Sequence, residues 1–359
     1  MILMFYNDAY FIHWRARDNT RYIKGHCEFN ARWPERVAAS IGRAGPIEAI
    51  SYFLHHGGQK IRKPAGFLTP QNFNELAQCI KYLPQYNDLT CKIAGYWLKA
   101  LPQIPHILLC DTAYFARLPY TASNYAIPHQ LQRQDVRRYG RYGLSHQWIT
   151  NRIHPLIGMA QPKLISVYLG NHTNMAALNG SRPLETSFGF TPIEGMPSLT
   201  GSGSIDPTIV FNLHAAGMTF KEISNLLSQQ SGLAALAGQR ISLPAIFNAR
   251  PGSRGIAARD FYCYNARKWI GSFMATLGGI DALVFFGEQP ETLGGIISDI
   301  CRAFAFLGLE CKRIMRPGKD IWNLTGTSSQ VKIFCVRHNT WRVIEENMRR
   351  LLKTRRTRP

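Results

Sequence analysis

The stretch IPHILLCDT, residues 104–112, joins an apolar run to a polar end and carries the first argument about the fold. Residues 104–110 have the composition of a buried strand, and Asp111 and Thr112 follow directly. Similar apolar stretches occur at residues 2–6, 163–169, 282–286 and 330–336. Helical patterns fall between them at residues 73–83, 220–229, 259–277, 292–306 and 342–352. Strands that alternate with helices predict an α/β protein.

The residues that directly follow these strands are the first candidates for a functional site, because α/β folds bind ligands beyond the carboxyl ends of their strands. Four such ends carry polar or glycine pairs: Asn7 and Asp8, Asp111 and Thr112, Gly170 and Asn171, Gly287 and Glu288. Glycine lets backbone N–H groups approach phosphate, and Asn, Asp and Glu orient hydrated Mg²⁺. The pattern favours a cleft that handles phosphate or metal, although ordinary turns also select these residue types.

Composition bounds the class of protein. The 359 residues, 45% of them hydrophobic, suit one large or two ordinary globular domains. No apolar run approaches the roughly 20 residues that span a bilayer, and the first residues show neither a basic leader nor a cleavage site. The eight cysteines form no C-x-x-C pair and no zinc spacing, so we expect buried reduced thiols and a cytoplasmic protein.

The net charge of +20 is high and raises the question of a polyanionic partner. Most of this charge is dispersed along the chain. The one dense basic cluster is at the C-terminus: Arg349, Arg350, Lys353, Arg355, Arg356 and Arg358. It follows an amphipathic helical pattern, so two interpretations remain open: a solvated helix and tail, or a segment that binds polyanions.

Seven segments together resemble the acetate kinase family, in order and in spacing. CDTAYFARLP at 110–119 resembles F-D-T-A-F-H-x-x-x-P, and VRRYGRYGLSH at 136–146 resembles R-R-Y-G-F-H-G-T-S-H. TSFGFTPIEG at 186–195 is nearly T-S-M-G-F-T-P-L-E-G. The other matching segments are HGG at 56–58, YLGNHTN at 168–174, SGSIDP at 202–207 and ALVFFGEQ at 282–289. The chain is therefore identified as a divergent member of this family.

The resemblance implies a fold and a reaction. The fold is the two-lobed α/β architecture of acetate and sugar kinases, Hsc70 and actin (ribonuclease H-like), with a central cleft. We expect an N-terminal lobe at residues 1–145, a nucleotide-binding lobe at 146–335 and a basic helix and tail at 336–359. Family members use ATP and Mg²⁺ to phosphorylate a short carboxylate such as acetate, reversibly, and are usually homodimers. A nucleotide and a small carboxylate are thus the expected partners.

The resemblance also assigns roles to individual residues. Asp111 takes the place of the catalytic aspartate, Asn7 that of a metal-associated asparagine, and Pro192 that of a carboxylate-pocket residue. The positions that match the family's ATP-binding residues are Leu169, Gly170, Asn171, Arg240, Gly287 and Glu288.

Other family positions have lost their chemistry. Phe53 and Gly201 stand where the family has arginines, and Tyr86, Tyr142 and Tyr168 stand where it has histidines. Apolar pocket positions fall at His55, Gln85 and Arg141, residues 9–14 replace the serine-rich phosphate loop and its lysine, and residues 338–341 read HNTW in place of T-N-E-E. Tyrosine carries no positive charge at neutral pH, and one lost electrostatic stabiliser slows phosphoryl transfer by about 10²–10³.

Two functional hypotheses follow. The first is a carboxylate kinase with impaired activity, on acetate or an altered substrate, in which Arg141 is a candidate to supply part of the missing charge. The second is a catalytically inactive homologue that acts as a binding or scaffold protein.

Overall fold

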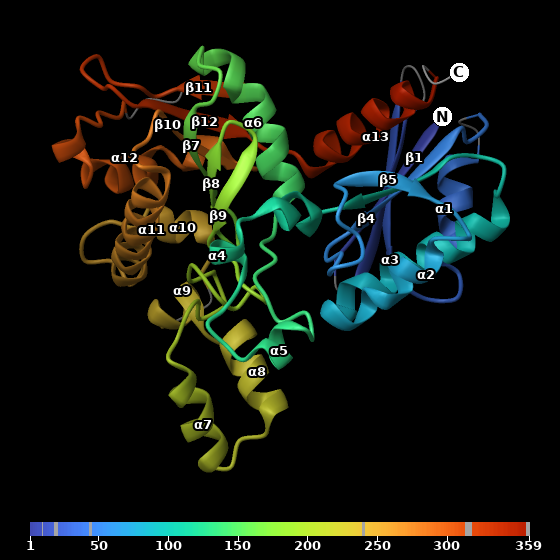
Figure 1. The fold of residues 1–359 in the computed structure, drawn as a ribbon, viewed down its shortest axis with the longest axis horizontal. Helices are drawn as coiled ribbons and strands as arrows, with labels where there is room; N and C mark the ends of the chain where they lie inside the picture. The colour runs from blue at the N-terminus through green and yellow to red at the C-terminus, as the bar shows by residue number, and fades with distance from the viewer. Residues whose placement is uncertain (9, 18–20, 43–44, 239–240, 313–317, 357–359) are drawn as a thin grey trace. The chain divides into compact units, whose positions relative to one another are not determined.

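The computed structural model describes residues 1–8, 10–17, 21–42, 45–238, 241–312 and 318–356. Contacts divide the chain into two compact units (Figure 1). The first unit is Met1–Ala116 with Thr340–Pro359, and the second is Arg117–Asn339. Each is described by itself below, and the bounds expected from the sequence for separate lobes stay a prediction. Among the described residues, no helix is long and apolar enough to cross a membrane.

The first unit is built on a six-stranded sheet in the order β3-β2-β1-β4-β6-β5. Its strands are β1 (Ile2–Asn7), β2 (Phe11–Arg17), β3 (Tyr22–Glu28), β4 (Ala49–Leu54), β5 (Ala65–Leu68) and β6 (His106–Cys110). β1, β4 and β6 run parallel, while β2, β3 and β5 pair antiparallel at the two sides. The carboxyl ends of the three parallel strands therefore meet at one edge of the sheet.

Helices cover both faces of this sheet, as the fully buried strand β4 requires. The helices of the unit are α1 (Trp33–Ile41), α2 (Phe73–Gln78), α3 (Pro84–Ala100) and α13 (Thr340–Arg356). α3 packs against β1 and β4 and α1 against β3, whereas α13 packs against β4, β5 and β6, on the other face (Figure 1). Alternate residues of β4 point to opposite faces of the sheet. Ile50, Tyr52 and Leu54 belong to the hydrophobic core that also contains Trp33 and Trp97.

The second unit holds a six-stranded sheet in the order β11-β12-β10-β7-β8-β9. Its strands are β7 (Lys163–Tyr168), β8 (Asn174–Asn179), β9 (Arg182–Thr186), β10 (Ala282–Gly287), β11 (Ile321–Asn323) and β12 (Lys332–Arg337). β7, β10 and β12 are parallel, and β8, β9 and β11 are antiparallel to their neighbours. This unit repeats the plan of the first, so its parallel strands also end at a common edge.

Two long helices sandwich this second sheet. α11 (Ile256–Leu277) lies over β7, β8 and β9, and α6 (Gly143–Ile157) contacts β7 from the other face. The remaining helices are α4 (Tyr120–Ser123), α5 (His129–Gln132), α7 (Pro207–Ala215), α8 (Phe220–Gln229), α9 (Gly232–Leu236), α10 (Leu243–Phe247) and α12 (Gly294–Arg302).

The α/β class expected from the sequence is confirmed, and so are its five strands, to within two residues at each end. The helix expected at 220–229 is α8 itself. The helices expected at 73–83 and 292–306 are shorter than expected, since each passes into a 3₁₀ turn, Ile80–Tyr82 and Ala305–Leu307. All eight cysteines are free, and all but the half-buried Cys311 are buried, as expected.

Candidate active site

In the first unit, the parallel strands bring Asn7, His55 and Asp111 to the same edge of the sheet. Asn7 ends β1, His55 directly follows β4, and Asp111 directly follows β6. The registers of β1 with β4 and of β4 with β6 fix these ends side by side. The backbone N–H of Asp111 donates to the carbonyl of Leu54 at 2.9 Å, which ties the end of β6 to the end of β4. Asp111 is only 2% exposed.

Asn7, the residue proposed for metal, is buried and bound by protein on both sides of its amide. Its Nδ2 donates to the carbonyl of Tyr86 at 2.8 Å, and its Oδ1 accepts from the hydroxyl of Thr90 at 2.9 Å. Its carbonyl accepts from Nε2 of His55 at 2.7 Å. Asn7 therefore joins β1 to α3 and to the end of β4.

The turn at His56, Gly57 and Gly58 is held by Asn87, which the sequence did not single out, and by Thr112, one of the strand-end candidates. Asn87, fully buried on α3, donates from Nδ2 to the carbonyls of His56 at 2.8 Å and Cys79 at 2.7 Å. The backbone N–H of Gly57 donates to the hydroxyl of Thr112 at 3.0 Å. An asparagine inside an otherwise apolar helix face was the available signal, because a buried amide needs fixed partners.

Aromatic side chains crowd this edge where the resemblance implies cations. The ring of Tyr6 lies 5.2 Å from Phe53 and 6.3 Å from Trp341, between centroids. His55 lies 5.0 Å from Phe53 and 4.7 Å from Tyr86. We call these five residues the first aromatic cluster. Phe53 is 7% exposed, so it fills space rather than offering charge to a ligand.

In the second unit, the ends of β7, β10 and β12 place most of the residues expected to bind ATP. The N–H of Leu169 donates to the carbonyl of Phe286 at 2.8 Å, and the N–H of His338 donates to the carbonyl of Gly287 at 2.8 Å. Gly170 thus lies close to Gly287. The side chain of Leu169 is buried in the core, so only its backbone can face a ligand.

Asn171 and Glu288 have exposed side chains beside these strand ends. Within the part of the chain that the structure describes, the N–H groups of Gly170 and Asn171 donate to no acceptor. Two successive N–H groups of this kind can receive an anion such as phosphate. Gly170 also has an internal reason to be glycine, since a Cβ there would lie 2.7 Å from the Tyr168 hydroxyl.

Aromatic rings fill this second edge as well. Tyr168 lies 4.4 Å from Tyr142, 5.3 Å from Phe286 and 5.4 Å from His338, between centroids. These four residues form the second aromatic cluster. Tyr142 has a φ of +57°, which is unusual for a large side chain and stores strain at the start of α6.

Three histidines near this edge are neutral at pH 7 because of burial. Burial lowers the pKa of His146 to about 3 and the pKa of His338 to about 4. For His172, burial and then the charge of Arg141 lower the pKa to about 4. Nδ1 of His146 lies 2.6 Å from the Ser166 hydroxyl. These histidines supply no positive charge to a developing transition state.

His146 belongs to a closed hydrogen-bond network. Its Nε2 lies 2.7 Å from Oδ1 of Asn174, an acceptor, so Nε2 carries the proton and Nδ1 accepts from Ser166. Nδ2 of Asn174 donates to the hydroxyls of Thr186 and Ser187 at 3.3 and 3.2 Å. The sequence motif identified His146 but gave no sign of these partners, which belong to β7, β8 and β9.

The arginines of this region differ in their engagement. Arg138 forms ion pairs with Glu185 at 3.1 Å and Glu194 at 2.6 Å, so its charge is balanced within the unit. Arg141 is 9% exposed, and its guanidinium lies 5.3 Å from the centre of the Tyr142 ring. The charge of Arg141 helps to lower the pKa of His172, which lies just after β7. Arg141 therefore stays a candidate to replace part of the positive charge that the resemblance implies.

The remaining candidates lie in loops. Pro192 is half-buried between β9 and α7, and Arg240 lies outside the described residues. Gly201, in the same loop as Pro192, donates its N–H to the Ser198 hydroxyl at 2.7 Å. The N–H of Leu199 donates to the carbonyl of Asn171 at 2.9 Å, which fastens this loop to the end of β7.

A Mg²⁺ ion, implied by the resemblance, finds no cage of protein ligands among the described residues. Across the described ranges, no group of three or more His, Cys, Asp or Glu side chains could hold a metal. Asn7 already binds Tyr86 and Thr90, and residues 338–341 contain no carboxylate. Mg²⁺ at kinase sites is held mainly by substrate phosphates and water with one or two carboxylates, so here it would enter with the nucleotide, and no step below passes through a metal.

Solved structures share this architecture. The chain matches the acetate kinase of Entamoeba histolytica with a TM-score of 0.88 at 21% identity, covering 97% of this chain and 98% of that one. It matches the acetate kinase of Porphyromonas gingivalis with a TM-score of 0.86 at 24% identity, covering 98% and 99%. A propionate kinase from Francisella tularensis matches with a TM-score of 0.85. The fold is therefore that of the actin, Hsc70 and sugar kinase class, as expected.

Sequence comparison defines the family within that class. The model of the Acetokinase family matches residues 37–346. The acetate kinase of Gloeobacter violaceus is 35% identical over 75% of this chain and 68% of its own length. That of Acaryochloris marina is 30% identical over 83% of this chain and 75% of its own length. The chain belongs to the acetokinase family.

Proposed function

We propose that this protein binds ATP and a short carboxylate, and transfers the γ-phosphoryl group to the carboxylate far more slowly than a relative with the family's cations. Family membership supports the reaction class, and the conversion of ATP and a carboxylate to ADP and an acyl phosphate is the reaction that relatives named acetate kinase suggest. The replacement of cationic side chains at the two strand-end regions supports the reduced rate.

The observation that carries the proposal is that aromatic side chains occupy described positions where the resemblance implies arginine or histidine. Phosphoryl transfer spreads negative charge over three oxygens, and proteins accelerate it mainly by positioning and by positive electrostatics. Phe53 and Tyr86 lie in the first aromatic cluster, and Tyr142 and Tyr168 lie in the second. The buried histidines beside the second cluster are neutral at pH 7, because burial holds their pKa values at about 3 to 4.

The residues that remain can still bind and orient. The N–H groups of Gly170 and Asn171 offer donors to a phosphate, and Glu288 lies beside them at the end of β10. In the first unit, Asp111 is held at the end of β6 by its N–H bond to Leu54, in a position to orient a reacting group. The proposed role of Asp111 is therefore orientation, which lowers the barrier without supplying charge.

The carboxylate preference is proposed to differ from that of acetate kinases. A small apolar pocket selects the methyl group of acetate. Here His55, Gln85 and Arg141 fall at its apolar positions, and only Pro192 matches. His55 is buried, and its Nε2 donates to the Asn7 carbonyl. A more anionic carboxylate, able to pair with Arg141, is the better substrate candidate.

The alternative is a catalytically inactive family member that acts as a binding or scaffold protein. The closed network of His146 with Ser166 and Asn174 favours it, since this histidine serves the packing of α6 on the sheet. The C-terminal helix could then contribute basic surface. Arg349 pairs with Glu345 at 2.8 Å, and Arg355 lies 5.7 Å from the Phe67 ring centre, so part of the basic cluster is docked on its own unit. Residue Arg358 lies outside the described residues.

Acyl-phosphate formation, trapped as a hydroxamate, tests these possibilities with Mg-ATP and acetate, propionate or succinate. The proposal predicts slow product formation, largest with succinate and abolished by Asp111→Asn, together with a rise in Tm on adding ATP. Rapid turnover of acetate would contradict it. A rise in Tm with ATP but no product above the Asp111→Asn background would favour the binding protein, and no rise in Tm would remove the nucleotide from the proposal.

A further inference from the structure

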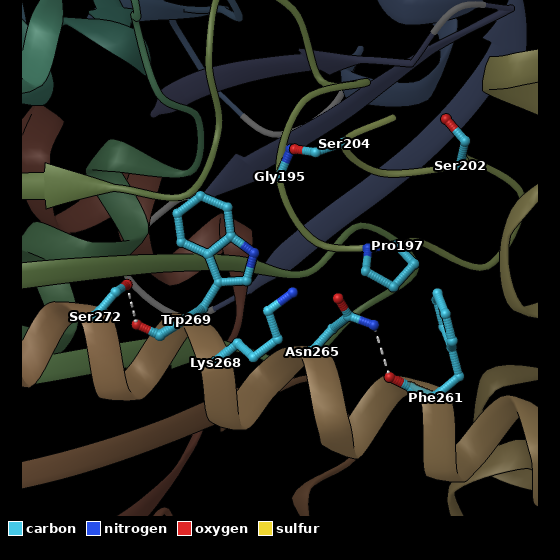
Figure 2. Close-up of a pocket in the computed structure, with 9 residues that line it drawn as sticks. All are labelled: Gly195, Pro197, Ser202, Ser204, Phe261, Asn265, Lys268, Trp269 and Ser272. Carbon is cyan, nitrogen blue, oxygen red and sulfur yellow. Dashed lines mark hydrogen bonds between the residues drawn. The ribbon is translucent and has the colours of Figure 1, made fainter. Parts of the chain in front are cut away.

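A pocket separates α11 from the loop of residues 195–204 in the second unit (Figure 2). Its volume is about 330 Å³, which lies at the lower end of the range of small-molecule sites. The lining residues are Gly195, Pro197, Ser202, Ser204, Phe261, Asn265, Lys268, Trp269 and Ser272. None of them is among the residues assigned above to phosphate or carboxylate, and Ser202 directly follows Gly201, the position of a family arginine.

The floor of the pocket is one face of α11. Phe261, Asn265, Lys268, Trp269 and Ser272 recur at the spacing of a single helical face. The adjoining face of the helix carries Tyr262, Ala266, Ile270 and Phe273, which are all buried in the core. The hydroxyl of Tyr262 lies 2.7 Å from that of Thr173. Packing therefore holds the floor in place before any ligand arrives.

The roof is a loop with its own hydrogen bonds. The N–H of Gly195 donates to the Ser204 hydroxyl at 2.9 Å, and the N–H of Ser204 donates to the Gly195 carbonyl at 3.0 Å. The N–H of Ser202 donates to the carbonyl of Leu227 at 2.8 Å, which attaches the loop to α8. A φ of +73° and close contact with Pro197 require glycine at Gly203. The loop is thus preorganised.

The chemistry of the lining combines one cation with aromatic walls. Figure 2 shows Lys268 rising from α11 beside Trp269 toward the loop. Within the described ranges Lys268 has no carboxylate partner, and no acidic side chain lines the pocket. Its ammonium also lies 5.4 Å from the Tyr264 ring centre. Phe261 is 45% exposed, and Trp269 is half-buried.

We propose that this pocket binds a small aromatic carboxylate. The ring packs on the indole of Trp269, and the carboxylate accepts hydrogen bonds from the Lys268 ammonium and from the Ser204 hydroxyl, since the Ser202 hydroxyl already donates to the Gly203 carbonyl at 2.9 Å. An uncompensated ammonium in a pocket without acids selects an anion, and exposed aromatic surface selects a flat apolar body. The proposal does not rest on phosphoryl transfer, since neither catalysis nor ATP enters it.

The test uses the full chain labelled with 5-fluorotryptophan and followed by ¹⁹F NMR. Loss of one signal in Trp269→Phe assigns its resonance among the seven tryptophans. Benzoate is the probe, benzamide the neutral counterpart, and inorganic phosphate the anion without a ring. We expect benzoate to shift the Trp269 resonance saturably in the millimolar range, while the signals of the other tryptophans stay in place. Benzamide should bind about tenfold more weakly, because it lacks the charge.

Variants of Lys268 decide whether the pocket acts through this residue. Lys268→Gln should weaken benzoate about tenfold, and Lys268→Arg should keep most of the affinity, since the charge remains. Lys221→Gln, an exposed lysine on α8, is the matched control and should change nothing. Equal binding of benzamide and benzoate, an unchanged Lys268→Gln, or a phosphate shift as large as that of benzoate would overturn the proposal. So would a Trp269 resonance that moves with protein concentration alone, which would show a second copy on this face.

Discussion

The strand-end regions of the two units have the same strand arrangement but carry different side chains. In the first unit, side chains from two helices, Tyr86 of α3 and Trp341 of α13, pack with Phe53 against the ends of β1 and β4. In the second unit, the edge keeps two backbone N–H groups directed at no protein acceptor, at Gly170 and Asn171 in the described chain. The first edge is thus lined by aromatic side chains, whereas the second keeps a feature suited to an anion.

The difference teaches that the charged side chains of a site can be replaced while the backbone geometry of the site is kept. Parallel strands bring their ends together through register alone, and this requires only apolar residues in the strands. Positive charge near a reacting group depends on single side chains, whose replacement leaves the sheet intact. Aromatic residues at Phe53 and Tyr168 even add buried surface, which stabilises the fold.

The largest expected effect in this comparison belongs to the turn that follows β4. A Cβ on Gly57 would collide with the Sγ of Cys110 and lie 2.6 Å from the carbonyl of Ile61. Gly57→Ala should therefore lower the free energy of unfolding by about 3 kcal/mol, because the backbone cannot yield cheaply. Urea denaturation measures this change, with Gly66→Ala as control, since nothing lies within 4 Å of its Cβ.

An equal effect of the two alanine substitutions would show that the first edge is loosely packed. The aromatic cluster would then be adaptable, and the argument that Phe53 fills a fixed space would fail.

Much of this fold follows from the sequence, for local reasons. The helix expected at 220–229 from its helical pattern is confirmed to the residue, and the structure shows a capping box of Thr219 and Glu222 at its start. Strand ends were predictable because an apolar run stops at a polar or glycine residue, as at Cys110 and Asp111. The helix expected at 292–306 ends at Arg302 instead, and the chain turns at Gly308 with a φ of +72°.

The site was less predictable, because its partners are distant in sequence. Thr90 and Asn7 lie 83 residues apart, yet they share a hydrogen bond. The acceptor of His146 is on β8, and nothing in the motif around residue 146 reveals that burial lowers its pKa to about 3. Periodicity finds elements, but the pairing of polar side chains depends on how those elements pack.

A second prediction concerns pH and the second unit. Burial lowers the pKa of His338 to about 4 in the folded protein. In the unfolded chain this histidine has its ordinary pKa of about 6.5, so between these values only the unfolded chain is protonated there. Stability is therefore complete above about pH 6.5 and falls as the pH drops toward 4, by about 1.4 kcal/mol per pH unit for this histidine.

In the variant His338→Gln, the free energy of unfolding should depend less steeply on pH, by about 1.4 kcal/mol per pH unit. At pH 5 the variant should therefore be destabilised by acid about 2 kcal/mol less than the unchanged protein. Chemical denaturation at pH 5, 6 and 7 measures the slopes of both proteins. His129→Gln, an exposed histidine, is the matched control. If His338→Gln keeps the full slope, His338 titrates normally, and the neutral character of the second edge is wrong there.

A third and smaller effect tests the polar lock of the first edge. The Thr90 hydroxyl lies 2.9 Å from both Oδ1 of Asn7 and the carbonyl of Phe53. Thr90→Val removes the donor and leaves a buried amide oxygen without it, which should cost about 1–2 kcal/mol. Thr276→Val on the exposed side of α11 is the control and should cost less than about 0.5 kcal/mol. Equal costs would mean that the Thr90 hydroxyl contributes little to holding Asn7 in place.

The central claim is that the lost charges, and not the fold, limit phosphoryl transfer in this chain. The most direct measurement is the rate of acetyl-phosphate formation from saturating Mg-ATP and acetate at pH 7, beside the acetate kinase of Porphyromonas gingivalis under the same conditions. Loss of more than one electrostatic stabiliser predicts a kcat at least about 10³-fold below that relative. A kcat within about tenfold of it would contradict the account, because the cations counted as missing would then be unnecessary.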